Sequence, residues 1–159
     1  MSIQVGDRLP NASVSIMTAD GEKQINTDDI FAGKKVVLFA LPGAYTPTCS
    51  AAHLPGFVVH SDAIKAKGVD TIACLSVNDA FVMHAWGEVN NVEDNILMLA
   101  DGSGNFTQAV GMEKDLTERN FGMRSQRYAL IAEDGVVTHL NIDPAALESS
   151  DAETILGLL

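Results

Sequence analysis

The chain has 159 residues, 47% of them apolar and 19% charged, and its 21 acidic residues outnumber 10 basic ones to give a net charge of −11. This length suits one domain, residues 1–159, with a substantial core. The acidic balance excludes nucleic acid and anionic membrane as expected partners. The N-terminal run MSIQVGDRLPN lacks the basic and apolar regions of a secretory leader, so we expect a cytoplasmic, reducing location.

The first half of the chain predicts a hairpin followed by a strand–helix–strand unit. A turn at Asp20-Gly21 indicates the hairpin, and valine-rich apolar runs indicate strands buried on both faces. The predicted elements are hairpin strands Ala12–Met17 and Lys23–Asn26, a helical turn Thr27–Ile30 stopped at Gly33, a strand Lys35–Leu41, a helix Cys49–Lys67 ended by Gly68, and a strand Asp70–Val77. This order implies parallel pairing through a right-handed crossover.

The second half predicts more helices and a late hairpin. Asp79 or Asn78 is the expected cap of one helix, and Glu133-Asp134-Gly135 is a hairpin turn. The predicted elements are helix Asp79–Asn90, strand Asn95–Leu99, short helix Asn105–Gly111, hairpin strands Arg127–Ala132 and Val136–Asn141, and a C-terminal helix opened by a capping box at residues 150–153. Together they predict the α/β class, with a central mixed sheet flanked by helices.

The stretch PGAYTPTCS, residues 42–50, predicts a turn that presents Cys49. With Thr46 as N-cap, its hydroxyl accepts from first-turn amides, Pro47 takes the first helical position and Cys49 the third. The helix dipole there favours a thiolate, which is the nucleophilic form of cysteine. The C-terminal end of a parallel strand is also where open α/β sheets bind ligands. Pro55 removes one backbone hydrogen bond and predicts a kink or widening of the helix.

Cys49 taken alone fits two interpretations. Most isolated cysteines are small buried hydrophobes, and a Thr-Pro helix start is common. The neighbouring residues favour a reactive cysteine instead, because Pro42-Gly43 ends the strand sharply and the polar Thr46 and Thr48 flank the sulfur. A cysteine that only packs in a core needs neither feature.

Four segments of the chain resemble the peroxiredoxins, specifically the peroxiredoxin 5 (type II, atypical) subfamily. These segments are LPGAYTPTCSAAHLPGF (41–57), CLSVNDAFVMHAW (74–86), LADGSGNFT (99–107) and RSQRYALIAEDGVV (124–137). They cover nearly the whole chain at matching spacing. Tyr45 stands where the subfamily usually has phenylalanine.

The resemblance implies a thioredoxin-like fold and the reduction of hydrogen peroxide and organic hydroperoxides. It implies an active-site set of Pro42, Thr46, Cys49 and Arg127. Arg124 also belongs to the pattern, and we expect it to lie behind the active-site set or at an interface. A homodimer is expected on the same ground, and no metal or organic cofactor is implied.

Elementary chemistry agrees with the implied roles. A Cys49 thiolate attacks one peroxide oxygen and becomes a sulfenic acid, while the other oxygen leaves as water or alcohol. Negative charge moves onto the leaving oxygen, so fixed donors are needed around the O–O bond. Arg127 supplies several donors and a permanent charge, and Thr46 can donate to the leaving oxygen or relay a proton. Pro42 is expected to shield the sulfur, and the amides of residues 48 and 49 to complete the donors.

The four histidines show no standard metal spacing with the cysteines. His53 lies one helical turn from Cys49, so it could share a zinc ion with the cysteine or polarise the thiol. We expect instead that His53 is a helix residue packed near the site entrance.

The reductant is predicted to be an external thiol. Cys74 lies in an apolar strand and is by default a buried core thiol, although related proteins carry a possible resolving cysteine at this spacing. The animal-type resolving position near the C-terminus holds Ser149 and Ser150. Glutathione, with or without glutaredoxin, is the expected donor and thioredoxin the second, with a Cys74 disulfide as an alternative.

Two other classes compete with the peroxidase. A peroxide sensor or chaperone-like binding module shares the chemistry of Cys49 but turns over poorly. A disulfide oxidoreductase of the thioredoxin type needs a CxxC motif, and position 46, three residues before Cys49, is a threonine.

Overall fold

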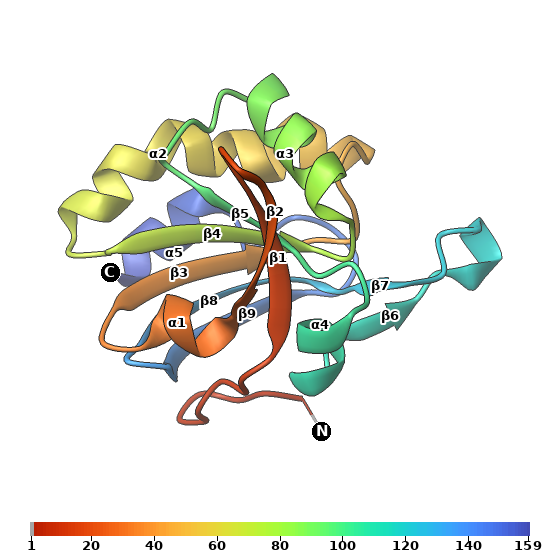
Figure 1. Cartoon of the computed structure of the whole chain (residues 1–159). Coiled ribbons are helices and arrows are strands. Elements are labelled where there is room, and N and C mark those ends of the chain that lie inside the picture. The colour runs from red at the N-terminus through yellow and green to blue at the C-terminus, as the bar shows by residue number, and fades with distance from the viewer. Residues whose placement is uncertain (1) are drawn as a thin grey trace.

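A computed structural model describes residues 2–159, and its centre is a seven-stranded mixed sheet (Figure 1). The sheet order is β2-β1-β5-β4-β3-β8-β9. The strands are β1 Ser13–Thr18, β2 Gly21–Asn26, β3 Lys35–Ala40, β4 Thr71–Ser76, β5 Leu97–Ala100, β8 Arg127–Glu133 and β9 Val136–Asp143. The fold is thioredoxin-like, as predicted, and the N-terminal hairpin joins the sheet through one β1–β5 pair.

The central strands are the apolar runs that the sequence marks as buried. β3 pairs in parallel with β4 and antiparallel with β8, with Ala40 opposite Leu75 on one side and Tyr128 on the other. β4 in turn pairs in parallel with β5. Helical residues 49–66 connect β3 to β4, which is the predicted crossover.

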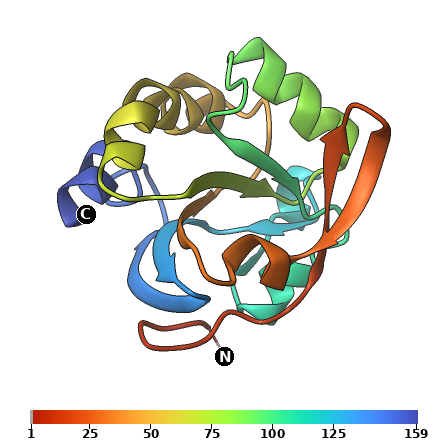
Figure 2. The ribbon, with the colours of Figure 1, turned by 60° about the vertical axis from the view of Figure 1, so that its left-hand side comes forward.

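Helices cover both faces of the sheet, as Figure 2 shows. They are α1 Thr27–Phe31, α2 Leu54–Ala66, α3 Ala80–Val89, α4 Asn105–Ala109 and α5 Ala152–Leu158. The alternation of β3 separates two cores, because successive side chains of a strand point to opposite faces. Val37, Phe39 and Leu41 join the core under α2, α3 and α5, and Val36 and Leu38 join the core with α1 and α4.

One hairpin was not expected from the sequence. Strands β6 Glu113–Asp115 and β7 Met123–Ser125 form a separate two-stranded sheet joined through the 3-10 turn η2 Thr117–Arg119. It projects from the body of the molecule in Figure 1. Its strands are only three residues long and mostly polar, so they carry no apolar alternation for a sequence pattern to detect.

Several predicted boundaries are wrong by a few residues. The turn of the first hairpin is Ala19-Asp20, with Gly21 already paired to Thr18. The C-terminal helix is capped by Asp151, whose side chain accepts from the Thr154 amide, and not by the predicted capping box. The Ser150 hydroxyl instead donates to Asp143, which orients it toward that carboxylate. Asp79 caps α3 as predicted.

Within residues 2–159, no helix is long and apolar enough to cross a bilayer.

Candidate active site

Cys49 opens a π-helical turn, η1 Cys49–His53, at the C-terminal end of β3. Pro47 and Thr48 are helical before it, and the Ser50 amide donates to the Thr46 carbonyl at 2.9 Å. The Leu54 amide donates to the Cys49 carbonyl, a bond that spans five residues instead of four. Pro55 has no amide to continue a regular ladder, so the predicted widening is confirmed.

The Cys49 sulfur is fully buried and contacts a cation. Its exposure is 0%, and the Nη2 of Arg127 donates to its Sγ at 3.1 Å. Arg127 is the first residue of β8, and pairing of β8 with β3 brings it beside the helix start. A guanidinium donor stabilises a sulfur anion more than a neutral thiol. The arrangement therefore favours a nucleophilic cysteine.

His53 lies behind the arginine in a closed hydrogen-bonded chain. Its Nε2 bonds to the Ser150 carbonyl at 3.0 Å, and its Nδ1 bonds to Nη1 of Arg127 at 2.7 Å. Because a carbonyl can only accept and a guanidinium can only donate, these partners define the tautomer of His53: Nε2 carries the hydrogen and donates, and Nδ1 accepts. Burial, and then the Arg127 charge, lower the pKa of His53 to about 4. The imidazole is thus neutral at physiological pH.

This placement corrects the expectations for His53. The ring is 1% exposed and packs against Phe39 and Phe57, so it does not lie at the site entrance. Both nitrogens are engaged by partners other than Cys49, which leaves none to polarise the thiol or to bind zinc with it. Among residues 2–159, no cluster of three His, Cys, Asp or Glu side chains could hold a metal ion.

Thr46 occupies the predicted N-cap position but makes a different bond. Its hydroxyl donates to the Gly43 carbonyl at 2.7 Å, instead of accepting from a first-turn amide as the sequence analysis predicts. The bond closes the turn between β3 and the helix. With its hydrogen committed to Gly43, the Thr46 oxygen is left as an acceptor.

Arg124 fastens the turn that precedes Cys49. From β7, its Nη1 donates to the Pro42 carbonyl at 3.2 Å and its Nε to the Phe121 carbonyl at 2.9 Å. The close approach favours glycine at position 43, because a Cβ there would lie 2.8 Å from Arg124 Nη1 and would displace the guanidinium. Arg124 thus lies behind the candidate active-site residues, where we expected it.

A cavity of about 230 Å³ lies at the mouth of this arrangement. Its walls are Pro42, Thr46, Pro47 and Thr48, then Lys114, Leu116, Arg119 and Phe121 from the unpredicted hairpin, and Arg127, Asp143, Pro144 and Ala145. Three of the four predicted active-site residues, all except Cys49, thus line the cavity. One of them, Arg127, also forms the hydrogen bond to the buried Cys49 sulfur.

Cys74 is a free, fully buried thiol in β4, opposite Phe39. Burial raises the pKa of Cys74 well above its usual value, and the neighbouring Cys49 raises it further. It therefore stays protonated and belongs to the same core cluster as Cys49. This is the default expectation for a cysteine in an apolar strand.

Asp143 and Ser150 are site residues that the sequence analysis missed. Asp143 accepts from the amides of Glu148, Ser149 and Ser150 and from both serine hydroxyls. Burial alone would raise the pKa of Asp143, but these hydrogen bonds outweigh it and hold the pKa well below its ordinary value. An aspartate followed by two serines in an irregular segment is too common a pattern to signal this role.

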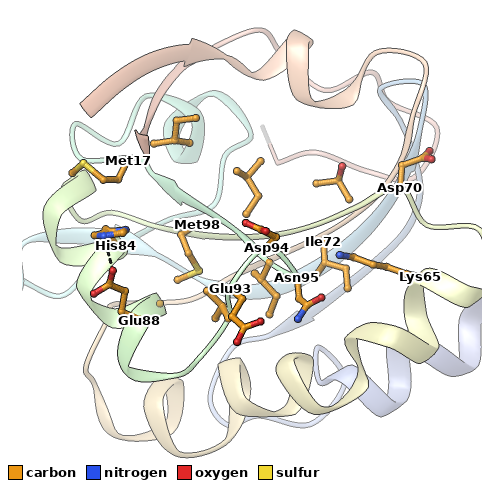
Figure 3. A pocket seen from close by; sticks show the side chains of 16 residues that line it. Met17, Lys65, Asp70, Ile72, His84, Glu88, Glu93, Asp94, Asn95 and Met98 are labelled. Carbon is orange, nitrogen blue, oxygen red and sulfur yellow. Dashed lines mark ion pairs between the residues drawn. The ribbon is translucent and has the colours of Figure 1, made fainter. Parts of the chain in front are cut away.

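A larger cavity lies elsewhere in the molecule. It measures about 560 Å³ and is lined from β1, β4, β5 and α3 and the ends of neighbouring loops (Figure 3). His84 and Glu88 of α3 form an ion pair there, and Lys65 and Asp70 lie at the opposite side of the view. None of the candidate active-site residues lines it, so size does not identify the reactive centre here.

Comparisons with known proteins agree with this geometry. The Redoxin family model matches residues 4–156. The chain is 51% identical to Peroxiredoxin-2E-2, chloroplastic, of Oryza sativa subsp. japonica and 46% identical to Peroxiredoxin-2E, chloroplastic, of Arabidopsis thaliana, over 99% of this chain and 73% and 70% of theirs. It is also similar to reduced Prx3 from Vibrio vulnificus in complex with hydrogen peroxide, with a TM-score of 0.95, 57% identity and 98% of both chains covered. Because two relatives are chloroplastic, a cytoplasmic location stays a prediction.

Proposed function

The chain belongs to the peroxiredoxins, thiol peroxidases with an antioxidant role, and from that premise we propose that Cys49 is its peroxide-reducing nucleophile. The observation that carries the proposal is the 3.1 Å contact between Arg127 Nη2 and the Cys49 sulfur. Arg127 stabilises the thiolate before the reaction and faces the same sulfur on which the peroxide must align.

The chemical step breaks one O–O bond and forms one S–O bond. The Cys49 thiolate attacks the terminal peroxide oxygen, and the other oxygen leaves with the bonding electron pair. It takes up one proton and departs as water or alcohol, leaving a sulfenic acid. Arg127 stabilises the charge that moves onto the leaving oxygen. Thr46, already donating to Gly43, accepts the hydroxyl hydrogen of the bound peroxide and orients it.

Pro42 completes the proposed site by limiting access. It lines the cavity and is itself half-buried, while its carbonyl is held by Arg124. The cavity of about 230 Å³ admits a small peroxide, and the sulfur below it is closed to bulk water. Water exclusion strengthens the electrostatic contribution of Arg127.

We propose that an external thiol recycles the enzyme, with glutathione as the donor, alone or with glutaredoxin. Glutathione carries two carboxylates and one ammonium group, so it is an anion. Three of the ten basic side chains of this acidic protein, Lys114, Arg119 and Arg127, line the cavity mouth. Such a local reversal of charge attracts an anionic thiol. Thioredoxin is the second candidate.

Recycling takes two exchanges that balance. A glutathione thiolate attacks the sulfenic sulfur and forms a mixed disulfide, and the displaced hydroxide takes up the proton that the glutathione thiol gave up and leaves as water. A second thiolate, from glutathione or glutaredoxin, attacks the glutathione sulfur, forms a disulfide with it and releases the Cys49 thiolate. The alternative is a Cys74 disulfide, but Cys74 is protonated and locked in a central strand. Strict disulfide geometry requires the helix start to move before that bond forms.

We also propose a homodimer that pairs beside the active site. Tyr45 and Phe81 are large apolar side chains that are 52% and 65% exposed. The Tyr45 ring lies 6.4 Å from Trp86 of α3, the helix that also carries Phe81. Sedimentation of the wild-type chain and of Phe81→Glu tests the pairing; a wild-type monomer at micromolar concentration removes this proposal.

Intact mass after one equivalent of hydrogen peroxide tests the function. We expect a gain of one oxygen in wild type and Cys74→Ser and none in Cys49→Ser. A loss of two hydrogens that disappears in Cys74→Ser assigns recycling to Cys74 instead. A wild-type chain that forms the sulfenic acid but turns over slowly with glutathione and thioredoxin alike is a sensor or binding module. No mass change in wild type refutes the peroxidase.

A further inference from the structure

We infer that Asp143 positions Arg127, through Ser150 and His53, for the reaction at Cys49. This inference rests on the proposed function, because it assigns a role within the same site. Its basis is an unbroken chain of hydrogen bonds that runs from a carboxylate at the end of β9 to the reactive sulfur.

The chain begins with a segment folded around a carboxylate. Asp143 is the last residue of β9, in register with Arg127 of β8, and is 5% exposed. Five donor groups from Glu148, Ser149 and Ser150 converge on its two oxygens at 2.6–3.0 Å. An ionised carboxylate carries no hydrogen and can only accept, so a cluster made entirely of donors favours the ionised form. The backbone of residues 148–150 is thereby fixed.

The fixed backbone sets the tautomer of His53. The Ser150 carbonyl can only accept, so the single ring hydrogen of the neutral imidazole resides on Nε2. The Nδ1 lone pair then points at Arg127 Nη1, 2.7 Å away. If the carbonyl moved away, the hydrogen could shift to Nδ1, where it would oppose an N–H of the guanidinium. Asp143 thus holds the Ser150 carbonyl, which is one of the two partners that together set the tautomer of His53.

His53 in turn fixes the arginine at both of its terminal nitrogens. Nη1 is bound by the imidazole and Nη2 by the Cys49 sulfur, so the planar guanidinium has one allowed orientation. A displacement of about 1 Å at a reacting group costs roughly a hundredfold in rate. The precision of the site therefore depends on a segment that begins at Asp143, far beyond Cys49 in the sequence.

A direct charge interaction does not account for the arrangement. Among the ion pairs of residues 2–159, none joins Asp143 to Arg127 within 4.0 Å. The carboxylate is occupied by backbone amides and hydroxyls, and the two residues communicate through the histidine. Asp143 lines the cavity but has no bond to the Cys49 sulfur, which Arg127 binds, and it is accordingly a positioning residue.

Asp101 offers a matched control. It is also a buried carboxylate that accepts from two amides and a hydroxyl, those of Phe106 and Thr107. It organises the start of α4 and has no bond to the Cys49–Arg127–His53 chain. Asp101→Asn therefore measures the cost of breaking such a segment without disturbing the reactive centre.

The test compares Asp143→Asn and Asp101→Asn in the full-length chain. The rate of Cys49 oxidation is measured by rapid-quench mass spectrometry under single turnover, and stability by urea unfolding. We expect Asp143→Asn to lower the second-order rate constant for hydrogen peroxide about tenfold to a hundredfold. Asp101→Asn is expected to change it less than twofold while losing comparable stability. A wild-type rate in Asp143→Asn overturns the inference, as does an equal loss in both variants.

A spectroscopic measurement distinguishes a positioning role of Asp143 from a purely structural one. Nitrogen-15 NMR of the imidazoles reports the tautomer, and His53 is assigned by its absence in His53→Gln. We expect Nε2–H alone in wild type and Asp101→Asn, and a mixture of tautomers in Asp143→Asn. Unchanged Nε2–H in Asp143→Asn overturns the inference. If Asp143→Asn fails to fold, Ser149→Ala with Ser150→Ala, which keeps the carbonyl and removes two donors, is measured for the same rate loss and tautomer mixture.

The outcomes also separate this inference from the proposed function. A wild-type chain that does not react with peroxide refutes the function. A reactive wild type with an equally reactive Asp143→Asn refutes the positioning role alone.

Discussion

The Nε1 of Trp86 donates a 3.0 Å hydrogen bond to the hydroxyl of Ser50, the residue that follows Cys49. Trp86 is the only tryptophan of the chain and is fully buried. The bond ties α3 to the π-helical turn, so any rearrangement of that turn changes the surroundings of the indole.

We therefore predict that Trp86 fluorescence reports the oxidation of Cys49. Addition of one equivalent of hydrogen peroxide should change the emission in a single step whose rate is proportional to peroxide concentration, and glutathione should restore it. Stopped-flow fluorescence measures both. Cys49→Ser should give no step, while Ser50→Ala should keep the rate but alter the amplitude. A step that persists in Cys49→Ser would mean that the signal arises from other chemistry.

Gly43→Ala should disturb the site through Arg124. A Cβ at position 43 would meet Arg124 Nη1 at 2.8 Å, and the guanidinium must leave the Pro42 carbonyl to make room. We expect a loss of about 1 kcal/mol of stability together with a slower reaction with peroxide. Arg124→Ala should cost a similar amount. The double variant should cost little more than Arg124→Ala, because only the 3.2 Å approach to Thr46 Cγ2 then remains. Additive losses in urea unfolding would contradict this coupling.

Pro55→Ala should separate stability from reactivity. The new amide can bond to the Ala51 carbonyl and draw the π-helical turn toward a regular α-helix. The free energy of unfolding should not fall, since proline is the poorer helix former. The position of the Cys49 sulfur against Arg127 should change, and the peroxide rate should drop about tenfold or more. Retention of the wild-type rate would show that the wide turn is dispensable.

His53 should make stability fall in mild acid. Its pKa is about 4 in the folded chain and about 6.5 when unfolded, so the unfolded state binds more protons in that window. Stability is present above pH 6.5 and is lost as the pH falls toward 4, by about 2 kcal/mol between pH 7.5 and pH 5. Urea unfolding at both pH values measures the loss. His53→Gln should be less stable at pH 7.5 but should show a smaller loss on acidification; an equal loss would assign the effect to other groups.

The basic residues at the cavity mouth should affect the rate of reaction with the reductant and not the rate of reaction with the peroxide. Lys114→Gln combined with Arg119→Gln should lower kcat/KM for glutathione about tenfold through lost steering, and should leave the rate of Cys49 oxidation by hydrogen peroxide unchanged. The wild-type value for glutathione should fall with salt, and that of the variant should fall less. Lys65→Gln combined with Lys67→Gln, an equal change of two charges at the far end of α2, is the control. Equal effects of both changes would point to net charge alone.

The sequence predicted the central part of the fold because its signals there are local. β3 and β4 are unbroken apolar runs, and the order of Pro47, Cys49 and Pro55 specifies a helix start with a defect. Arg127 came from a family resemblance, since an arginine at a strand start is ordinary by itself. Its contact with the sulfur depends on strand pairing across 78 residues, which no local pattern encodes.

The errors have the same physical origin. Thr46 was expected to cap the helix by its side chain, yet the Gly43 carbonyl takes its hydrogen. Ser150 fits a capping box in sequence, but Asp143 takes its hydroxyl and Asp151 becomes the cap. In each case a residue with several possible partners found the one that the tertiary fold brought closest. The role of His53 was hidden because both of its partners are remote in sequence.

The long sequence separations within the site have a consequence for the newly made chain. Cys49 meets Arg127 across 78 residues, and His53 meets Ser150 across 97. Contacts between residues so far apart in sequence form late in folding, after the intervening loops have closed. During synthesis the cysteine emerges without its guanidinium, and the guanidinium is held only when the last ten residues have joined the fold. The sulfur therefore gains its electrostatic partner only in the completed protein, and the nascent chain carries an ordinary thiol.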